Sequence, residues 1–265
     1  MLSIEEIKLL IEKLEKVKKE DLQELIDNNL KILKDIELAV DANNQEEIDR
    51  LDKTKEWFRM DVEQKRQQSN VEPWLYDTIR QKIQSFGKTE QYNSLEIGPG
   101  TGLFSKEFRA WTHNYFIDVL PELKDKIFRR FHPANLKRLK FYVTDKTNCA
   151  ELPKGAVNFV FSWDTFVFFT QEHIAQYLED LKTVLIPGGH CFIQYADCHF
   201  DFDLKQAKRG YWNYNTKTAM EKIIKDAGYE ALEWGQYKQG ANYVIFQRDG
   251  KQNPVVFKKT EIVLD

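Results

Sequence analysis

The stretch SLEIGPGTGLFSKEF, residues 94–108, joins a short apolar segment to a helix-like segment through three glycines at alternate positions. Gly98, Gly100 and Gly102 carry no Cβ, so the turn can take positive φ angles and let the backbone approach a ligand closely. Glu96 stands just ahead of this turn. A carboxylate there would repel the pyrophosphate that related glycine-rich loops bind, but would attract a ligand that carries an ammonium group. The stretch therefore predicts a nucleoside ligand at the end of the first strand of an α/β fold.

The segments that follow have the alternation of strands and helices expected of such a fold. A helix over 171–185 has apolar residues at helical spacing, and Pro187, Gly188 and Gly189 end it. A second helix over 216–228 has its cap at Asn215 or Thr216 and stops at Gly228. A further helix, 72–86, leads into the first strand. The expected strands after the first are 115–120, 140–145, 157–164, 190–196, 229–237 and 242–248, with 255–263 as an edge strand or a tail.

These motifs resemble the class I S-adenosylmethionine-dependent methyltransferases. The first motif of that family is an acid followed by glycines at alternate positions, and Glu96 to Gly102 matches each fixed position. The Pro-Gly turn in LIPGGHCFIQY, residues 185–195, also matches the turn that precedes the family's fifth strand. The resemblance covers about residues 71–250. It implies a Rossmann-like, seven-stranded, mostly parallel sheet with an antiparallel last strand, and S-adenosylmethionine as cofactor.

The expected cofactor site follows the carboxyl ends of the first four strands. Asp118 lies 20 residues after Gly98, where a carboxylate can accept hydrogen bonds from both ribose hydroxyls. The resemblance places the acid that ends the third strand, Asp145, near the adenine amino group. The complete expected set is Glu96, Ile97, Gly98, Pro99, Gly100, Thr101, Gly102, Asp118, Val119, Asp145, Lys146, Ser162 and Trp163.

Methyl transfer from a sulfonium requires alignment of the nucleophile and exclusion of water, and a base only where the acceptor must lose a proton. Ligands of open α/β sheets lie beyond the carboxyl ends of the strands, which selects 162–173 and 195–212. There His199 is the first candidate base and Asp164 the second, with an ordinary exposed histidine as the alternative. Phe168, Tyr195 and Trp212 are candidate substrate contacts, and core packing is the alternative for such aromatic residues.

A metal site is the other interpretation of the long loop after the fifth strand. His199, Asp201 and Asp203 alternate there, which is similar to metal-dependent, catechol-type members of the family. Alternation over a short segment does not establish that side chains converge on one ion. We therefore expect metal-independent transfer.

Composition indicates a globular protein without a general affinity for polyanions. The 265 residues have a net charge of −3, a pI near 6.0 and 42% hydrophobic residues. Such a charge gives no global attraction to nucleic acid or to an anionic membrane surface. No signal peptide or long apolar run is present, and the three cysteines have no metal or disulfide pattern. The cytoplasm is the expected location.

Residues 1–70 are expected to form a helical extension, separate from a methyltransferase domain over 71–265. This part has no proline or glycine, is rich in charges of both signs and carries three apolar stripes at helical spacing. The stripes require a partner. They predict either self-association or clamping of a substrate, or a helical hairpin packed on the chain's own catalytic domain.

Three functions remain open at this point. The first is an O- or N-methyltransferase acting on a small molecule or a glycan. The second is a nucleic-acid methyltransferase, suggested by five basic residues for which a solvated helix face is the preferred interpretation. Asp164, Thr165 and Phe166 stand where base-methylating DNA enzymes carry a Pro-Pro-aromatic motif, which disfavours this second function. The third is a non-enzymatic cofactor-binding assembly protein. The five basic residues are Arg129, Arg130, Lys137, Arg138 and Lys140.

Overall fold

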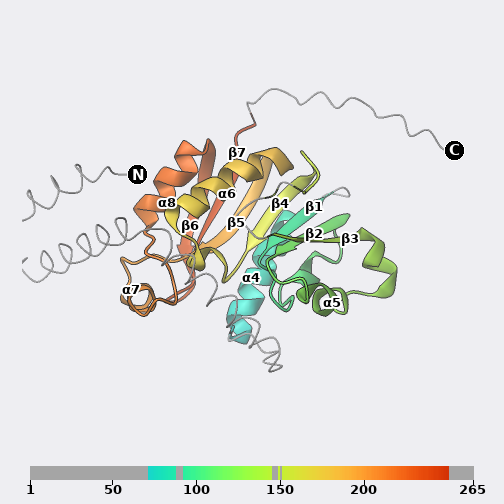
Figure 1. Ribbon diagram of the computed structural model, residues 1–265, viewed down its shortest axis with the longest axis horizontal. Helices are drawn as coiled ribbons and strands as arrows, with labels where there is room; N and C mark the ends of the chain where they lie inside the picture. The colour runs from blue at the N-terminus through green and yellow to red at the C-terminus, as the bar shows by residue number, and fades with distance from the viewer. Residues whose placement is uncertain (1–70, 88–91, 145–148, 150, 251–265) are drawn as a thin grey trace, which may run out of the picture.

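The computed structural model describes residues 71–87, 92–144, 149 and 151–250. These residues form one seven-stranded sheet in the order β3-β2-β1-β4-β5-β7-β6, with helices on both faces (Figure 1). The strands are β1 (Asn93–Ile97), β2 (His113–Asp118), β3 (Leu139–Val143), β4 (Val157–Ser162), β5 (Leu185–Tyr195), β6 (Tyr229–Gln236) and β7 (Asn242–Arg248). The helices are α4 (Pro73–Phe86), α5 (Leu123–Phe128), α6 (Gln171–Val184), α7 (Asp201–Lys208) and α8 (Lys217–Asp226), and the short 3₁₀ turns are η2 (Ser105–Phe108), η3 (Pro133–Arg138) and η4 (Phe166–Phe168).

The sheet has the direction pattern that the sequence predicts. β1 pairs in parallel with β2 and β4, β2 with β3, and β4 with β5. β7 runs antiparallel to both β5 and β6. The carboxyl ends of the first five strands therefore meet at one edge of the sheet, and the strand order reverses between β1 and β4 at that edge. The expected seven-stranded, Rossmann-like fold is confirmed.

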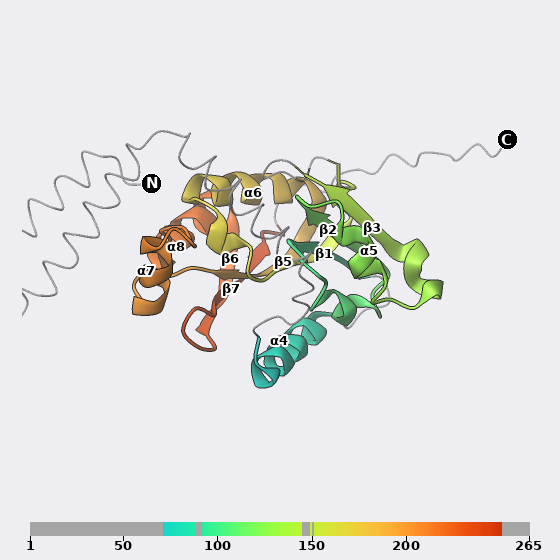
Figure 2. The ribbon, with the colours of Figure 1, turned by 60° about the horizontal axis from the view of Figure 1, so that its bottom comes forward.

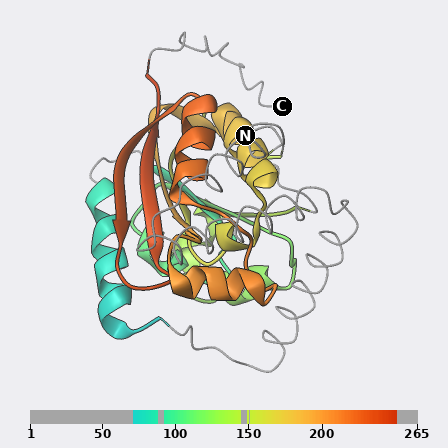
Figure 3. The same ribbon diagram turned by 90° about the vertical axis from the view of Figure 1, so that its left-hand side faces the viewer.

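Alternating apolar residues divide the core between the two faces of the sheet. Leu95 and Val160, paired between β1 and β4, pack with α6 and α8. Their neighbours Phe159 and Phe161 point the opposite way and pack with α4. Phe116, in register with Glu96, packs under α5 on this same face. Figure 3 shows α4 on one side of the sheet and α6 and α8 on the other, and Figure 2 separates α4 from α6 in the same way.

Hydroxyl caps begin the two long helices on the far face. Thr170 accepts a hydrogen bond from the backbone N–H of His173 at the start of α6, and Thr216 accepts one from Ala219 at the start of α8. Such caps satisfy N–H groups that have no partner within the helix. The observed bounds agree closely with the predicted helices at 171–185 and 216–228.

The connection between β5 and α8 differs from the prediction of an irregular loop, because it contains helix α7. Only Asp203 and Ala207 of this helix are buried. It therefore has no apolar stripe from which the helix could be predicted. β5 also differs, since it begins at Leu185 and continues through Pro187 and both glycines, with a shift in its register against β4.

Several predictions lie outside the described residues. These are the helical extension at 1–70, the end of the third strand with Asp145 and Lys146, and the edge strand at 255–263. In the described part of the chain, no helix has the length and apolar character needed to cross a membrane.

Candidate active site

The glycines of the bend after β1 share positive φ angles but lie in different surroundings. Gly98, Gly100 and Gly102 have φ angles of 65°, 53° and 81°, in the left-handed region that favours glycine. A Cβ on Gly98 would lie 2.1 Å from Oγ1 of Thr165, so the bend packs directly on the segment after β4. A Cβ on Gly100 would meet no protein atom within 4 Å. The bend is thus anchored at Gly98 and open to a ligand at Gly100.

Two carboxyl groups lie beside this bend. Glu96 is 3% exposed and accepts a hydrogen bond of 2.5 Å from the Ser105 hydroxyl. Burial raises the pKa of Glu96 to about 8; the Ser105 hydrogen bond opposes the rise and the neighbouring Asp118 adds to it. Asp118, the last residue of β2, has its pKa raised to about 6 by burial, against hydrogen bonds from backbone N–H groups that include that of Leu120 at 3.1 Å. A cation bound here would stabilise both ionised forms.

Arg130 is a basic residue whose charge acts on this pair of carboxyl groups. Its Nε donates a hydrogen bond of 2.5 Å to the carbonyl of Thr101 inside the bend. A Cβ on Gly102 would come within 3.0 Å of the Arg130 Cδ, and the charge of Arg130 lowers the pKa of Glu96. Arg130 was grouped with four other basic residues in the sequence, and the structure gives it a separate place, against the glycine bend.

The other expected cofactor residues fall into different environments. Ile97 is buried, and its carbonyl accepts a hydrogen bond of 2.9 Å from the Ser162 hydroxyl. Trp163 is also buried and stacks on Tyr237 with 6.3 Å between ring centroids. The side chains of Ser162 and Trp163 are therefore buried beneath this edge of the sheet. Val119 is half-buried beside Asp118.

Asp164 takes an unusual conformation at the tip of β4. Its φ of 55° makes it the non-glycine residue with positive φ in the described part of the chain, a conformation that costs of order 1–3 kcal/mol unless the surroundings hold it. Its backbone N–H donates to Oε1 of Gln194 at 2.8 Å, and Nε2 of Gln194 donates to the carbonyl of Gly240 at 2.8 Å. Gln194 thereby joins the tip of β4 to the turn between β6 and β7.

The Asp164 side chain is accessible to solvent, yet desolvation raises its pKa to about 6 and Lys238 opposes the rise. Asp164 is thus an exposed residue at the tip of β4, with enough protein around its carboxyl group to disfavour the charged form. Lys238 also pairs with Glu72, ahead of α4, with 2.5 Å between Nζ and Oε2.

The other candidate base, His199, lies farther along the chain and on the surface. Its side chain is 58% exposed, and its Nδ1 lies 3.0 Å from Oδ1 of the buried Asp197. No hydrogen bond or ion pair connects His199 with Asp164 among the described residues. The two candidates therefore do not form one catalytic pair.

The three candidate substrate contacts are also separated. Tyr195 is buried in the core on the α6 and α8 face, edge-on to Trp234. Phe168 is half-buried, and its carbonyl accepts a hydrogen bond of 2.8 Å from Asn213. Trp212 is half-buried and packs edge-on against Phe202. Of the three, Phe168 and Trp212 keep exposed surface at this edge, and Tyr195 is a core residue.

Hydrogen bonds of buried polar side chains stabilise this edge of the sheet, and the burial of these side chains was not predicted from the sequence. Asp203 is fully buried and accepts hydrogen bonds at Oδ2 from the Asp197 N–H at 2.7 Å and from Asn242 at 2.5 Å. Asn213 and Asn215 donate to the carbonyls of Phe168 and Phe169, which fastens the segment before α8 to η4. A polar residue inside an apolar strand, such as Gln194 in HCFIQYA, was the available signal for this network.

The metal-site interpretation of the same loop has little geometric support. Asp203 points into the core, whereas His199 and Asp201 are exposed. Within the described ranges, no group of three or more His, Cys, Asp or Glu side chains is arranged to hold a metal ion.

Comparison with known protein families identifies the family of this chain. A family model described as a methyltransferase domain matches residues 70–233, which is more than half of the chain. The chain belongs to this methyltransferase family. Its fold is that of the class I S-adenosylmethionine-dependent enzymes, with the glycine bend, Glu96 and Asp118 inside the matched range. No curated protein sequence matches the chain.

Solved structures share the fold of this methyltransferase at low sequence identity. The PH0226 protein from Pyrococcus horikoshii OT3 is 16% identical, with a TM-score of 0.55 over 68% of this chain and 94% of that one. The geranyl diphosphate C-methyltransferase from Streptomyces coelicolor A3(2), in complex with Mg²⁺, geranyl diphosphate and S-adenosyl-L-homocysteine, is 11% identical, with a TM-score of 0.54 over 66% and 80%. A chain from the complex between the Haloferax volcanii Trm112 methyltransferase activator and the putative methyltransferase is 13% identical, with a TM-score of 0.53 over 69% and 99%.

Proposed function

We propose that this methyltransferase moves a methyl group from S-adenosylmethionine to an oxygen or nitrogen atom of a small molecule or a glycan, with Asp164 as the base. One observation carries the proposal. Asp164 is exposed at the tip of β4 and held in a left-handed conformation, and the next residue, Thr165, packs on Gly98 of the glycine bend. A proton acceptor and the bend that would receive the cofactor are thus adjacent.

The residues around the bend fit S-adenosylmethionine, which supplies a methyl group on a positively charged sulfur when bound. Gly100 faces open space, so the backbone can approach the ligand. Glu96 and Asp118 provide carboxyl oxygens for an ammonium group and for ribose hydroxyls. Solved structures of similar fold are complexes with S-adenosyl-L-homocysteine or sinefungin, which supports the same choice here.

Asp164 is better placed for proton transfer than His199. As the acceptor oxygen or nitrogen bonds to the methyl carbon, the Asp164 carboxylate would take the proton that the acceptor loses. The bond from the methyl carbon to sulfur breaks in the same step, and its electron pair stays on sulfur. With a pKa of about 6, Asp164 is mostly ionised at neutral pH, as a base must be.

The acceptor would bind between Asp164 and side chains from three other elements. Lys238 and Glu72, which pair where the β6–β7 turn meets the chain ahead of α4, would form one side. The Phe202 and Trp212 rings, which both lie against Gly240 of that turn, would form another. Aromatic faces and carboxylates together suit rings that carry hydroxyl or amino groups, as in sugars and many small metabolites.

Further parts of the proposal concern the whole protein. We place the methyltransferase domain over 71–265 and a helical extension over 1–70, which would serve self-association or substrate clamping. We also propose the cytoplasm as the location, since Cys149, Cys191 and Cys198 are all buried free thiols.

Calorimetry and a labelled-methyl assay test the proposal in two steps. The full chain should bind S-adenosylmethionine and S-adenosylhomocysteine, and Asp118→Ala should weaken both by at least tenfold. A panel of phenols, amines and sugars is then screened for transfer of the labelled methyl group. Failure of the wild-type chain to bind either cofactor form would refute the proposal, and cofactor binding without transfer to any acceptor would favour an assembly protein.

The base assignment has its own test once an acceptor is found. Asp164→Asn should lower turnover by about 10²–10⁴-fold and leave S-adenosylhomocysteine binding unchanged. Wild-type turnover should rise with pH through about 6 and level off above 7, because the carboxyl must lose its proton. His199→Gln is the matched control. If that variant loses turnover and Asp164→Asn does not, the base is His199.

A further inference from the structure

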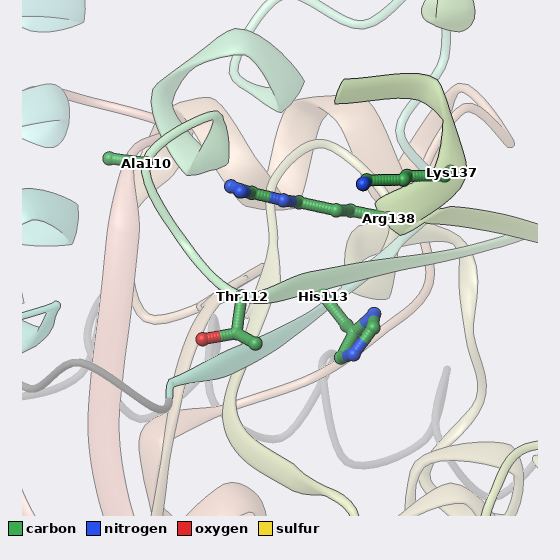
Figure 4. A pocket seen from close by; sticks show the side chains of 5 residues that line it. All are labelled: Ala110, Thr112, His113, Lys137 and Arg138. Carbon is green, nitrogen blue, oxygen red and sulfur yellow. The ribbon is translucent and has the colours of Figure 1, made fainter. Parts of the chain in front are cut away.

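A surface recess lies at the opposite edge of the sheet from the glycine bend. It has a volume of about 420 Å³ and is lined by Ala110, Thr112, His113, Lys137 and Arg138 (Figure 4). His113 begins β2, and Arg138 directly precedes β3. These are the amino ends of parallel strands, whereas Asp118 ends β2 at the other edge. The recess is therefore separate from the proposed methyl-transfer site.

The pairing of β2 with β3 builds this recess. Asn114 pairs with Leu139, so the residues that precede them, His113 and Arg138, enter the sheet side by side. The His113 backbone N–H donates to Oδ1 of Asn93 at 3.2 Å, which fixes where β2 begins. Lys137 and Arg138 are the last two residues of the 3₁₀ turn η3. Two neighbouring strand starts thus bring three nitrogen-bearing side chains to one recess.

The charge of the recess is positive, and the described part of the chain offers it no counterion at ion-pair distance. Figure 4 shows the Lys137 and Arg138 side chains extending in the same direction above the recess, with His113 and Thr112 on its other side. Among the described residues, no carboxylate lies within 4.0 Å of Lys137, Arg138 or His113. This local charge contrasts with the net charge of −3 of the whole chain. Parallel cations repel each other, and a shared anion would offset that repulsion.

We infer that this recess binds the phosphate group of a small phosphorylated molecule. The guanidinium of Arg138 offers a planar pair of N–H donors that suits phosphate oxygens, and the Lys137 ammonium adds a second charge. The volume falls within the range of about 300–1,000 Å³ that is typical of small-molecule pockets, so it has room for more than a bare phosphate. The imidazole ring of His113 can supply a further N–H donor.

Isothermal titration of the full chain with inorganic phosphate and with ribose 5-phosphate tests this inference. Ribose 5-phosphate should bind more tightly than phosphate, and the double variant Lys137→Ala/Arg138→Ala should weaken its binding by at least tenfold. Arg129→Ala, which removes an exposed basic residue outside the recess, is the matched control and should change the affinity less than twofold. His113→Ala, which removes a ring N–H donor, should also weaken binding of ribose 5-phosphate.

Three results would overturn the inference. Equal, millimolar binding of both compounds would indicate an adventitious ion only. Unchanged binding in the double variant would place the ligand elsewhere. Tighter binding of a DNA or RNA duplex, with an affinity that falls steeply with salt, would assign the recess to nucleic acid. S-adenosylhomocysteine binding should be equal in all these variants, so failure here leaves the proposed methyl transfer untouched.

Discussion

The buried carboxyl of Glu96 makes a quantitative prediction about stability without cofactor. In the unfolded chain this carboxyl has its ordinary pKa of 4.5, and in the fold burial raises the pKa to about 8. Between these two values the folded protein keeps a proton that the unfolded chain releases. The free energy of unfolding must therefore fall as the pH rises from about 4.5 to about 8.

The size of this effect follows from the difference between the two pKa values. Each pKa unit corresponds to about 1.4 kcal/mol, so the full loss is roughly 5 kcal/mol by pH 8. That is a large part of the 5–15 kcal/mol that typically stabilises a domain. Asp118 and Asp164 contribute with the same sign, but their loss is complete near pH 6. Of the described carboxyl groups with a raised pKa, Glu96 is the one that loses its proton in the fold between pH 6 and 8. Burial lowers the pKa of His190, whose effect on stability has the opposite sign and ends at its ordinary pKa of 6.5.

The variant Glu96→Gln isolates this contribution, because its amide cannot ionise and its carbonyl oxygen can still accept the Ser105 hydrogen bond. Urea unfolding of the cofactor-free protein, followed by tryptophan fluorescence, is measured from pH 5 to pH 8.5. Relative to wild type, the variant should gain several kcal/mol of stability between pH 6 and pH 8. Parallel curves for the two proteins would show that Glu96 has an ordinary pKa, and the reasoning would be wrong.

Three more substitutions test contacts around the same edge. Gly98→Ala should destabilise the fold by about 2–5 kcal/mol, from backbone strain and overpacking, whereas Gly100→Ala should cost only about 1–2 kcal/mol in urea unfolding because its Cβ meets no atom. Arg130→Met should weaken S-adenosylhomocysteine binding several-fold in calorimetry, with Arg129→Met unchanged; equal losses would remove Arg130 from the site. Gln194→Leu leaves the Asp164 N–H without its acceptor and should lower turnover more than cofactor affinity in the labelled-methyl assay; an equal effect on both would contradict a local role.

Much of the fold could be predicted from the sequence because its elements have strong periodic patterns. The strand expected at 242–248 coincides with β7, and α6 ends one residue before the predicted end of that helix. The glycine bend was predictable for a similar reason, since three alternate glycines have a direct conformational meaning, and their φ angles are all positive. In these cases a local pattern determines the local structure.

Contacts between segments that are distant in sequence could not be predicted in this way. Asp203 lies in a helix that lacks an apolar stripe, and its buried carboxyl group depends on a hydrogen bond from Asn242 in strand β7. The left-handed Asp164 depends on Gln194, which is 30 residues away. Tyr195 has the same residue type as an exposed substrate contact, yet the direction of β5 turns its ring into the core. Such features follow from tertiary packing.

Helix α4 crosses one face of the sheet, from the edge at the carboxyl ends of the parallel strands to the edge at their amino ends. Its start lies by the β6–β7 turn, where Glu72 pairs with Lys238, and its last turn packs at the amino edge, where Phe86 meets His190. Strand β7 runs in the same direction as α4. It ends at Arg248, beside the part of β5 that contains His190. The described chain thus enters at Val71 beside the proposed methyl-transfer site and leaves at Gly250 from the opposite edge of the sheet.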